Sequence, residues 1–154
     1  MKKSELIQAY NNIEKVIDRL ITRYGIQYES SADAPNTFKS MVDSYVEHGL
    51  FIVFDGGDHG YLGKTYNIKF RALHDFMHYY NGITFSFKDE KKLSDITVKL
   101  FAQTARELNI SYTECFYIGQ VMDAEIKGQI EYYEENKSYV VNQTEFIDSY
   151  LKVS

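Results

Sequence analysis

Apolar side chains return every three or four positions along most of the chain, the spacing of helices that bury one face. The longest stripe runs from Leu6 to Tyr24 and stops at Gly25, a residue typical of a helix C-terminus. A shorter stripe predicts a second helix that begins after Asn36 and ends at Gly49. The N-terminal third is therefore expected to contain two amphipathic helices.

A continuous apolar run interrupts this helical spacing. Leu50 to Phe54 predicts a strand, and Asp55-Gly56-Gly57-Asp58 ends it. Gly60 and Gly63 favour a loop or a hairpin in the next stretch. These glycines do not lead into the lysine and hydroxyl residues of a phosphate-binding loop, so we interpret them as turn residues. The pattern predicts a small β hairpin or strand element around residues 50–68.

Helical spacing returns after Asn67. One stripe ends at Asn81-Gly82 and consists of Phe70, Leu73, Met77 and Tyr80. A further helix is predicted to begin between Ser86 and Asp89 and to end near Asn109.

Two more helix starts follow. Ser111-Tyr112-Thr113-Glu114 has the form of a capping box, and its helix is predicted to run to about Tyr133. A weaker signal at Asn142 precedes a last short helix. We therefore expect a mainly α fold, a single-domain helical bundle that comprises residues 1–154.

Composition narrows the class of protein. With 154 residues, 44% of them hydrophobic, the chain can bury a core without metal or disulfide support. Seventeen Lys and Arg against 22 Asp and Glu give a charge of -5, which disfavours nucleic acid as the main partner. Cys115 is the only cysteine, so internal disulfides are excluded and a reducing cytoplasm is the expected location. We find no signal peptide and no apolar run of membrane-spanning length, so no membrane partner is expected.

Candidate chemistry begins with two histidines one helical turn apart. His74 and His78 project from the same side of their helix, at the margin of its apolar stripe, and should be partly buried. Imidazoles with this spacing can bind one metal ion. The alternative interpretation is a pair of hydrogen-bonded histidines, with Asp75 paired to Arg71 one turn earlier.

Two carboxylates on other helices point to the same interior. Glu125 falls near the centre of an apolar face, with Gln129 one turn later, and Glu90 lies on the same side of its helix as Leu93. An unpaired buried carboxylate costs several kcal/mol, so both groups need partners.

The inward-facing groups together predict a metal site in the bundle core. Its expected ligands are His74, His78, Glu90 and Glu125, and the residues expected to support them are Arg71 and Gln129. The alternative is a polar network without metal, in which Glu125 bonds tyrosine hydroxyls and Glu90 caps its own helix.

These same segments resemble small uncharacterised proteins of tailed bacteriophages. The shared pattern is R-A-x-H-D-x-x-H at residues 71–78, G-x-x-F followed by an acidic residue, and then E-x-x-G-Q at residues 125–129. It covers about half of the chain, from Arg71 to Phe146. The resemblance implies a phage-like origin and a shared site, and it implies no particular reaction.

Resemblance to better-known metal proteins is weaker. Compared with HExxH zinc peptidases, Asp75 is one methylene shorter than the glutamate base, and the third ligand has no assigned position. In HD-domain phosphohydrolases, His74-Asp75 would form the central doublet with His59 and Asp123, but helical spacing around His59 is missing. Ferritin-like sites need a Glu three residues before each ligand His, which neither His74 nor His78 has.

The residues support two hypotheses about function. The first is a metal-dependent hydrolase of a small molecule or peptide, in which Zn, Mn or Fe activates water and Asp75 or Glu125 accepts its proton. The second is a non-enzymatic phage protein of the host cytoplasm that binds and inhibits a host or defence factor through an acidic, Tyr-rich surface. The tyrosines considered for that surface are Tyr112, Tyr117, Tyr133, Tyr139 and Tyr150.

Overall fold

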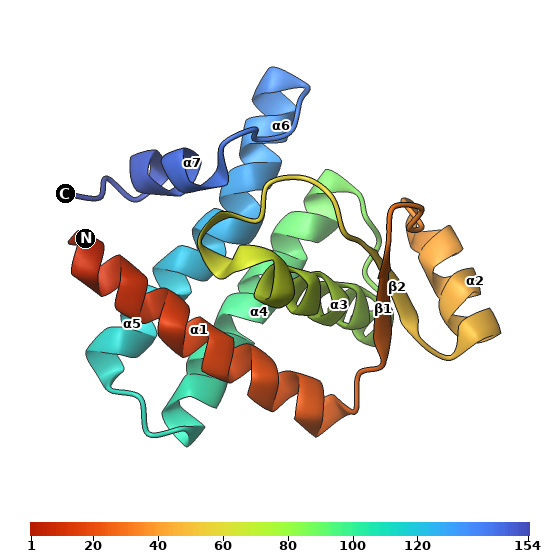
Figure 1. Ribbon diagram of the computed structural model, residues 1–154, viewed down its shortest axis with the longest axis horizontal. Helices are drawn as coiled ribbons and strands as arrows, with labels where there is room; N and C mark the ends of the chain where they lie inside the picture. Colours follow the sequence, from red (N-terminus) through yellow and green to blue (C-terminus); the bar gives the residue numbers. More distant parts are fainter.

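The computed structural model describes residues 1–154, and most of them lie in helices (Figure 1). The helices in chain order are α1 (Lys3–Tyr24), α2 (Phe38–His48), the short 3-10 turn η1 (Gly60–Leu62), α3 (Gly63–Asn81), α4 (Phe87–Glu107), α5 (Tyr112–Asp123), the π-helical segment η2 (Ala124–Gly128), α6 (Gln129–Asn136) and α7 (Gln143–Tyr150). The prediction of a mainly α fold is confirmed.

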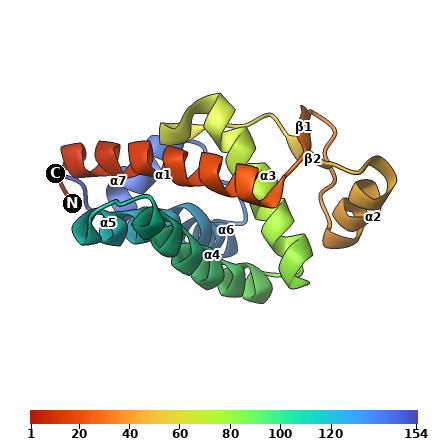
Figure 2. The same ribbon diagram turned by 90° about the horizontal axis from the view of Figure 1, so that it is seen from below.

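The core lies between α1 and the other long helices. Leu6, Ile13 and Leu20 of α1 are fully buried, and α1 packs on α3, α4 and α5. The turned view shows α1 on one side and α4 and α5 on the other (Figure 2). One cluster of 26 buried residues extends from Leu6 to Ile147. Since α1 ends at Gly25 with a left-handed backbone (φ 58°), its predicted C-terminus is also confirmed.

The β element contains the predicted strand, and its partner lies earlier in the chain than residues 50–68. β2 (Phe51–Phe54) forms as expected, but it pairs in parallel with β1 (Tyr28–Ser31), in register Tyr28 with Phe51. α2 supplies the crossover that a parallel pair requires, and it lies at the edge of the molecule in Figure 1. Of the two predicted alternatives, the strand forms and the hairpin does not, because the partner strand precedes β2. β1 is only partly buried at its two ends, so it leaves no apolar alternation in the sequence.

The helix that opens at Ser111 contains an unpredicted π segment. The Ser111 side chain accepts the backbone N–H of Glu114, as the capping box predicts. The helix then widens over η2 before it continues as α6. Such a segment shifts the helix face by part of a turn, and it includes Glu125. Gly128 lets α7 approach closely, because a Cβ there would lie 2.9 Å from the Tyr150 ring.

Tyr80 does not belong to the buried stripe of α3. It is 69% exposed because it lies in the last turn of α3, where its ring contacts only Phe76 and Tyr24 among the aromatic side chains. None of the helices combines the length and the apolar character needed to cross a bilayer.

Candidate metal centre

A short turn between α3 and α4 brings Glu90 to the two histidines. Gly82, with φ 63°, ends α3, and Ser86 caps α4 by accepting the backbone N–H of Asp89. Glu90 is therefore one turn into α4, directly opposite the last two turns of α3. The five residues of the turn leave little freedom in this placement.

His74, His78 and Glu90 form a tight group, which we call the His–Glu cluster. Nε2 of His74 lies 3.1 Å from Oε2 of Glu90, and Nε2 of His78 lies 3.0 Å from Oε1. The two Nε2 atoms are 3.1 Å apart. The His78 side chain is fully buried, whereas those of His74 and Glu90 are 21% and 17% exposed. Three of the four predicted ligand side chains thus lie together and face the interior.

The hydrogen bonds of this cluster do not balance without one extra positive charge. The carbonyl oxygen of Ile83 can only accept, so Nδ1 of His78, 2.7 Å away, carries a proton and donates it. Nε2 of a neutral His78 is then a lone pair, and it faces a Glu90 oxygen that also only accepts. Either a further proton or a metal cation must lie between these atoms.

A metal ion on Nε2 of both histidines and on Glu90 satisfies all three contacts. Bonds of about 2.0–2.1 Å in tetrahedral geometry separate neighbouring donor atoms by roughly 3.3 Å. The distances here, 3.0–3.1 Å, are close to that value. The backbone bond of His78 is the kind that orients a metal-binding imidazole. Nδ1 of His74 departs from this pattern, since it is buried without a partner.

The electrostatics of the cluster keep Glu90 ionised. Burial opposes its charge, but hydrogen bonds from His74 and His78 outweigh that effect and lower the pKa of Glu90 to about 2. Burial likewise opposes a charge on His74, and the bond to Glu90 overcomes it, so the pKa of His74 is raised. Glu90 thus supplies a full negative charge for a proton or a metal.

Glu125 lies outside the His–Glu cluster and has its own partners. The Tyr10 hydroxyl donates to its Oε1 at 2.5 Å, and Nε2 of Gln129 donates to Oε2 at 2.9 Å. Burial raises the pKa of Glu125, and these two hydrogen bonds only partly oppose the rise. The structure therefore does not bring Glu125 together with the other three expected ligands. It matches the alternative in which a tyrosine hydroxyl binds Glu125.

The remaining site residues take different positions. Asp75 does not line the cleft beside the cluster; burial raises its pKa to about 6, although His74 partly opposes the rise. Arg71 was expected to support the metal ligands or to pair with Asp75. Its Nη1 instead donates to the carbonyl oxygens of Phe54 and Gly56, at 2.5 and 2.9 Å. Gln129 does support a predicted residue, Glu125.

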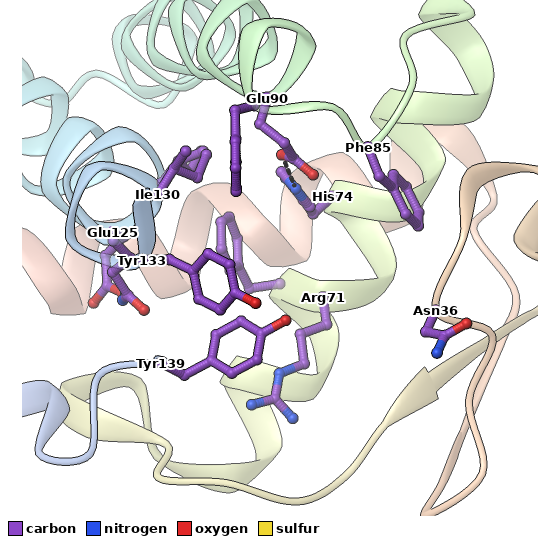
Figure 3. A pocket seen from close by; sticks show the side chains of 13 residues that line it. Asn36, Arg71, His74, Phe85, Glu90, Glu125, Ile130, Tyr133 and Tyr139 are labelled. Carbon is purple, nitrogen blue, oxygen red and sulfur yellow. Dashed lines mark hydrogen bonds and ion pairs between the residues drawn. The ribbon is translucent and has the colours of Figure 1, made fainter. Parts of the chain in front are cut away.

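A cleft of about 480 Å³ opens beside the cluster (Figure 3). His74, Glu90 and Glu125 all line it, so both carboxylates face one space. Much of the remaining lining is aromatic and comprises Phe70, Phe85, Phe87, Tyr133 and Tyr139. Sequence reasoning missed the role of these rings and of Tyr10. The density of aromatic residues at 85–87 and 132–139 was the available signal.

Comparison with known proteins adds no identity, since no protein-family model, curated protein or solved structure matches the chain. The resemblance to bacteriophage proteins therefore stays a prediction. So does the Tyr-rich binding surface, for which Tyr112 is 81% exposed on α5, whereas Tyr133 and Tyr139 line the cleft.

Proposed function

We propose that this protein is a metal-dependent hydrolase whose ion is held by His74, His78 and Glu90. The observation that carries the proposal is that Nε2 of His74 and Nε2 of His78 lie 3.1 Å apart and that each lies within 3.1 Å of a Glu90 carboxylate oxygen, so that the three side chains can share one metal ion. Two histidines and one carboxylate, with a fourth position on the side of a cleft, are typical of catalytic zinc sites. The same donor set suits Mn or Fe.

Residues around the proposed ion would activate the water molecule and accept its proton. A bound ion of this kind lowers the pKa of a water molecule toward neutrality. Glu125 is the candidate proton acceptor, because it lines the same cleft and because burial raises its pKa, which makes its carboxylate a stronger base. Tyr10 and Gln129 fix its carboxylate through their hydrogen bonds. Asp75 has no part in this scheme, because it does not line the cleft.

The test combines metal content with activity. Purified protein is analysed for bound metal and screened against phosphate esters, carboxylic esters and peptides. We expect about one equivalent of metal in the wild type and none in His74→Ala, because loss of one of three ligands weakens binding strongly. Glu125→Gln should keep the metal and lose at least ~10²-fold in kcat, the scale of a general base.

A matched control is Asp95→Asn, which removes an exposed carboxylate of α4, the helix that carries Glu90. It should change neither metal content nor rate. The proposal would be overturned if the wild-type protein bound no metal after incubation with zinc, manganese or iron. If the protein bound metal but hydrolysed none of these substrates, the site would be a structural metal site. The hypothesis of a non-enzymatic protein that binds a host or defence factor would then be the better account of function.

A further inference from the structure

Arg71 is the only Lys or Arg side chain that lines the cleft. The protein contacts its guanidinium group on one side only. Nη1 donates both of its protons to the carbonyl oxygens of Phe54 and Gly56 at the end of β2. The Phe54 ring lies under the guanidinium, 5.6 Å from its carbon. A guanidinium has five N–H groups, so three of them, on Nε and Nη2, have no acceptor in the protein.

Arg71 also lacks a direct ion-pair partner in the protein. No carboxylate forms an ion pair with it, and the side chain is half-buried, where Asp55 acts on it only through space. Arg71 precedes His74 by three residues on α3, so the two side chains lie on neighbouring turns of the same face. A fixed cation one turn from a proposed metal ligand is suited to an anion that spans both.

A second feature of the cleft is an aromatic wall, formed by Phe87, Tyr133 and Tyr139. Tyr133 lies 5.8 Å from Phe87 and 4.7 Å from Tyr139, measured between ring centroids. Figure 3 shows Tyr133 and Tyr139 side by side between Glu125 and Arg71. Phe87 is 44% and Tyr139 79% exposed, so the wall offers ring surface to a planar group.

From these two features we infer that the substrate is a phosphate monoester of a planar aromatic or heteroaromatic alcohol, an inference that rests on the proposed hydrolase. Arg71 binds phosphate oxygens with its free N–H groups, and the aromatic wall stacks on the ring. A phosphate fits better than a carboxylate, because it has enough oxygens to serve both the guanidinium and a metal ion at the His–Glu cluster, which line the same cleft, while the phosphorus stays open to attack.

The reaction balances without a further reactant. The oxygen of a water molecule bonds to phosphorus, and the phosphorus–oxygen bond to the ring-bearing alcohol breaks. One proton of the water passes to Glu125, and the alcohol leaves with a proton from solvent. The products are inorganic phosphate and the free alcohol, and Glu125 returns its proton to solvent.

The test compares phenyl phosphate, glycerol phosphate and phenyl acetate as substrates of the zinc-loaded protein. Arg71→Gln should lower kcat/KM for phenyl phosphate ~10²-fold with zinc content unchanged, and it should leave any phenyl acetate hydrolysis within about twofold. Tyr133→Leu with Tyr139→Leu should cost ~10-fold on phenyl phosphate and under about twofold on glycerol phosphate. Arg23→Gln, at an ion pair with Glu107 outside the cleft, is the matched control.

Binding of phenyl phosphate to zinc-loaded and to chelated protein separates the two proposals. The hydrolase proposal is overturned if the wild-type protein binds no zinc. Even then, phenyl phosphate binding to the chelated protein that is lost in Arg71→Gln would support the anion site. Equal binding by wild type and Arg71→Gln in both states overturns the substrate inference even if zinc is bound. If Arg71→Gln destabilises the chain at the end of β2, Arg71→Lys replaces it in this test, because lysine keeps the positive charge. Arg71→Lys should retain part of the phenyl phosphate binding.

Discussion

Two glutamates line the same cleft, yet their surroundings shift their pKa values in opposite directions. Glu90 meets the imidazoles of His74 and His78, and its pKa falls to about 2. Glu125 meets only the neutral donors Tyr10 and Gln129, and burial raises its pKa. Burial acts in the same direction on both, so the partners decide the outcome. In the proposed function, the region of Glu90 holds a cation and the region of Glu125 exchanges a proton.

The largest expected effect comes from breaking the first region. Glu90→Ala removes the only carboxylate of the His–Glu cluster and should lower the free energy of unfolding by about 3 kcal/mol, the scale for one partner of a buried pair. Metal content should fall to zero. Chemical denaturation of metal-loaded protein measures the loss, and Asp95→Asn, exposed on the same helix, should stay within about 0.5 kcal/mol of wild type.

A smaller effect is expected from the second region. Tyr10→Phe keeps a ring that is 3% exposed but deletes the hydroxyl that donates to Glu125. The buried carboxylate loses a partner, so stability should fall by about 1–2 kcal/mol, and metal content should be unchanged. Tyr66→Phe, which deletes a hydroxyl bound to Asp18 nearer the surface, is the control. Loss of metal in Tyr10→Phe would contradict the separation of the two regions.

The pH dependence of stability sharpens the comparison. The pKa of Glu125 is raised on folding, so the folded state keeps a proton that the unfolded state loses above the ordinary value of 4.5. The contribution of Glu125 to stability therefore falls as pH rises from 4.5 through its folded pKa. Glu125→Gln removes this dependence, and its stability relative to wild type should therefore increase over that window. Denaturation of both proteins from pH 4 to 8 measures it, and a constant difference would refute the raised pKa.

The smallest expected change in stability comes from breaking an exposed ion pair, that of Asp18 with Lys69. Asp18 accepts from Lys69 and Tyr66, and these bonds outweigh burial, so its pKa is lowered. A lowered pKa gives stability that is present above 3.8 and is lost as pH falls through the folded pKa. Asp18→Asn should cost only about 0.2–1 kcal/mol at neutral pH, since the side chain is 47% exposed. A cost as large as that of Glu90→Ala would show that burial does not separate the two sites.

Helical periodicity was sufficient to predict part of this site. His74 and His78 share a face by their spacing alone, and Glu90 follows from the signal that begins α4. Periodicity also predicted that the Glu125 side chain faces the interior. It could not reveal that Tyr10, 115 residues away, would reach Glu125, because such a contact depends on how α1 packs on η2.

Other features depended on geometry that the sequence does not carry. The pairing of β1 with β2 needs the crossover through α2, and nothing in Tyr28–Ser31 alternates in burial. Arg71 has an acidic residue four positions later, which favoured an Arg71–Asp75 pair, but its guanidinium donates to the carbonyls of Phe54 and Gly56 instead. The functional consequence, an unpaired cation in the cleft, appears only in three dimensions.

The most direct measurement is a zinc titration followed by the ¹⁵N NMR signals of the histidine side chains. Bound zinc should move the Nε2 signals of His74 and His78 together, saturate at one equivalent and leave Nδ1 of His78 protonated. Glu125→Gln should give the same titration, and Glu90→Ala should abolish it. Nε2 signals that remain those of a protonated imidazole at every zinc concentration would show that a proton, and not a metal, bridges the cluster.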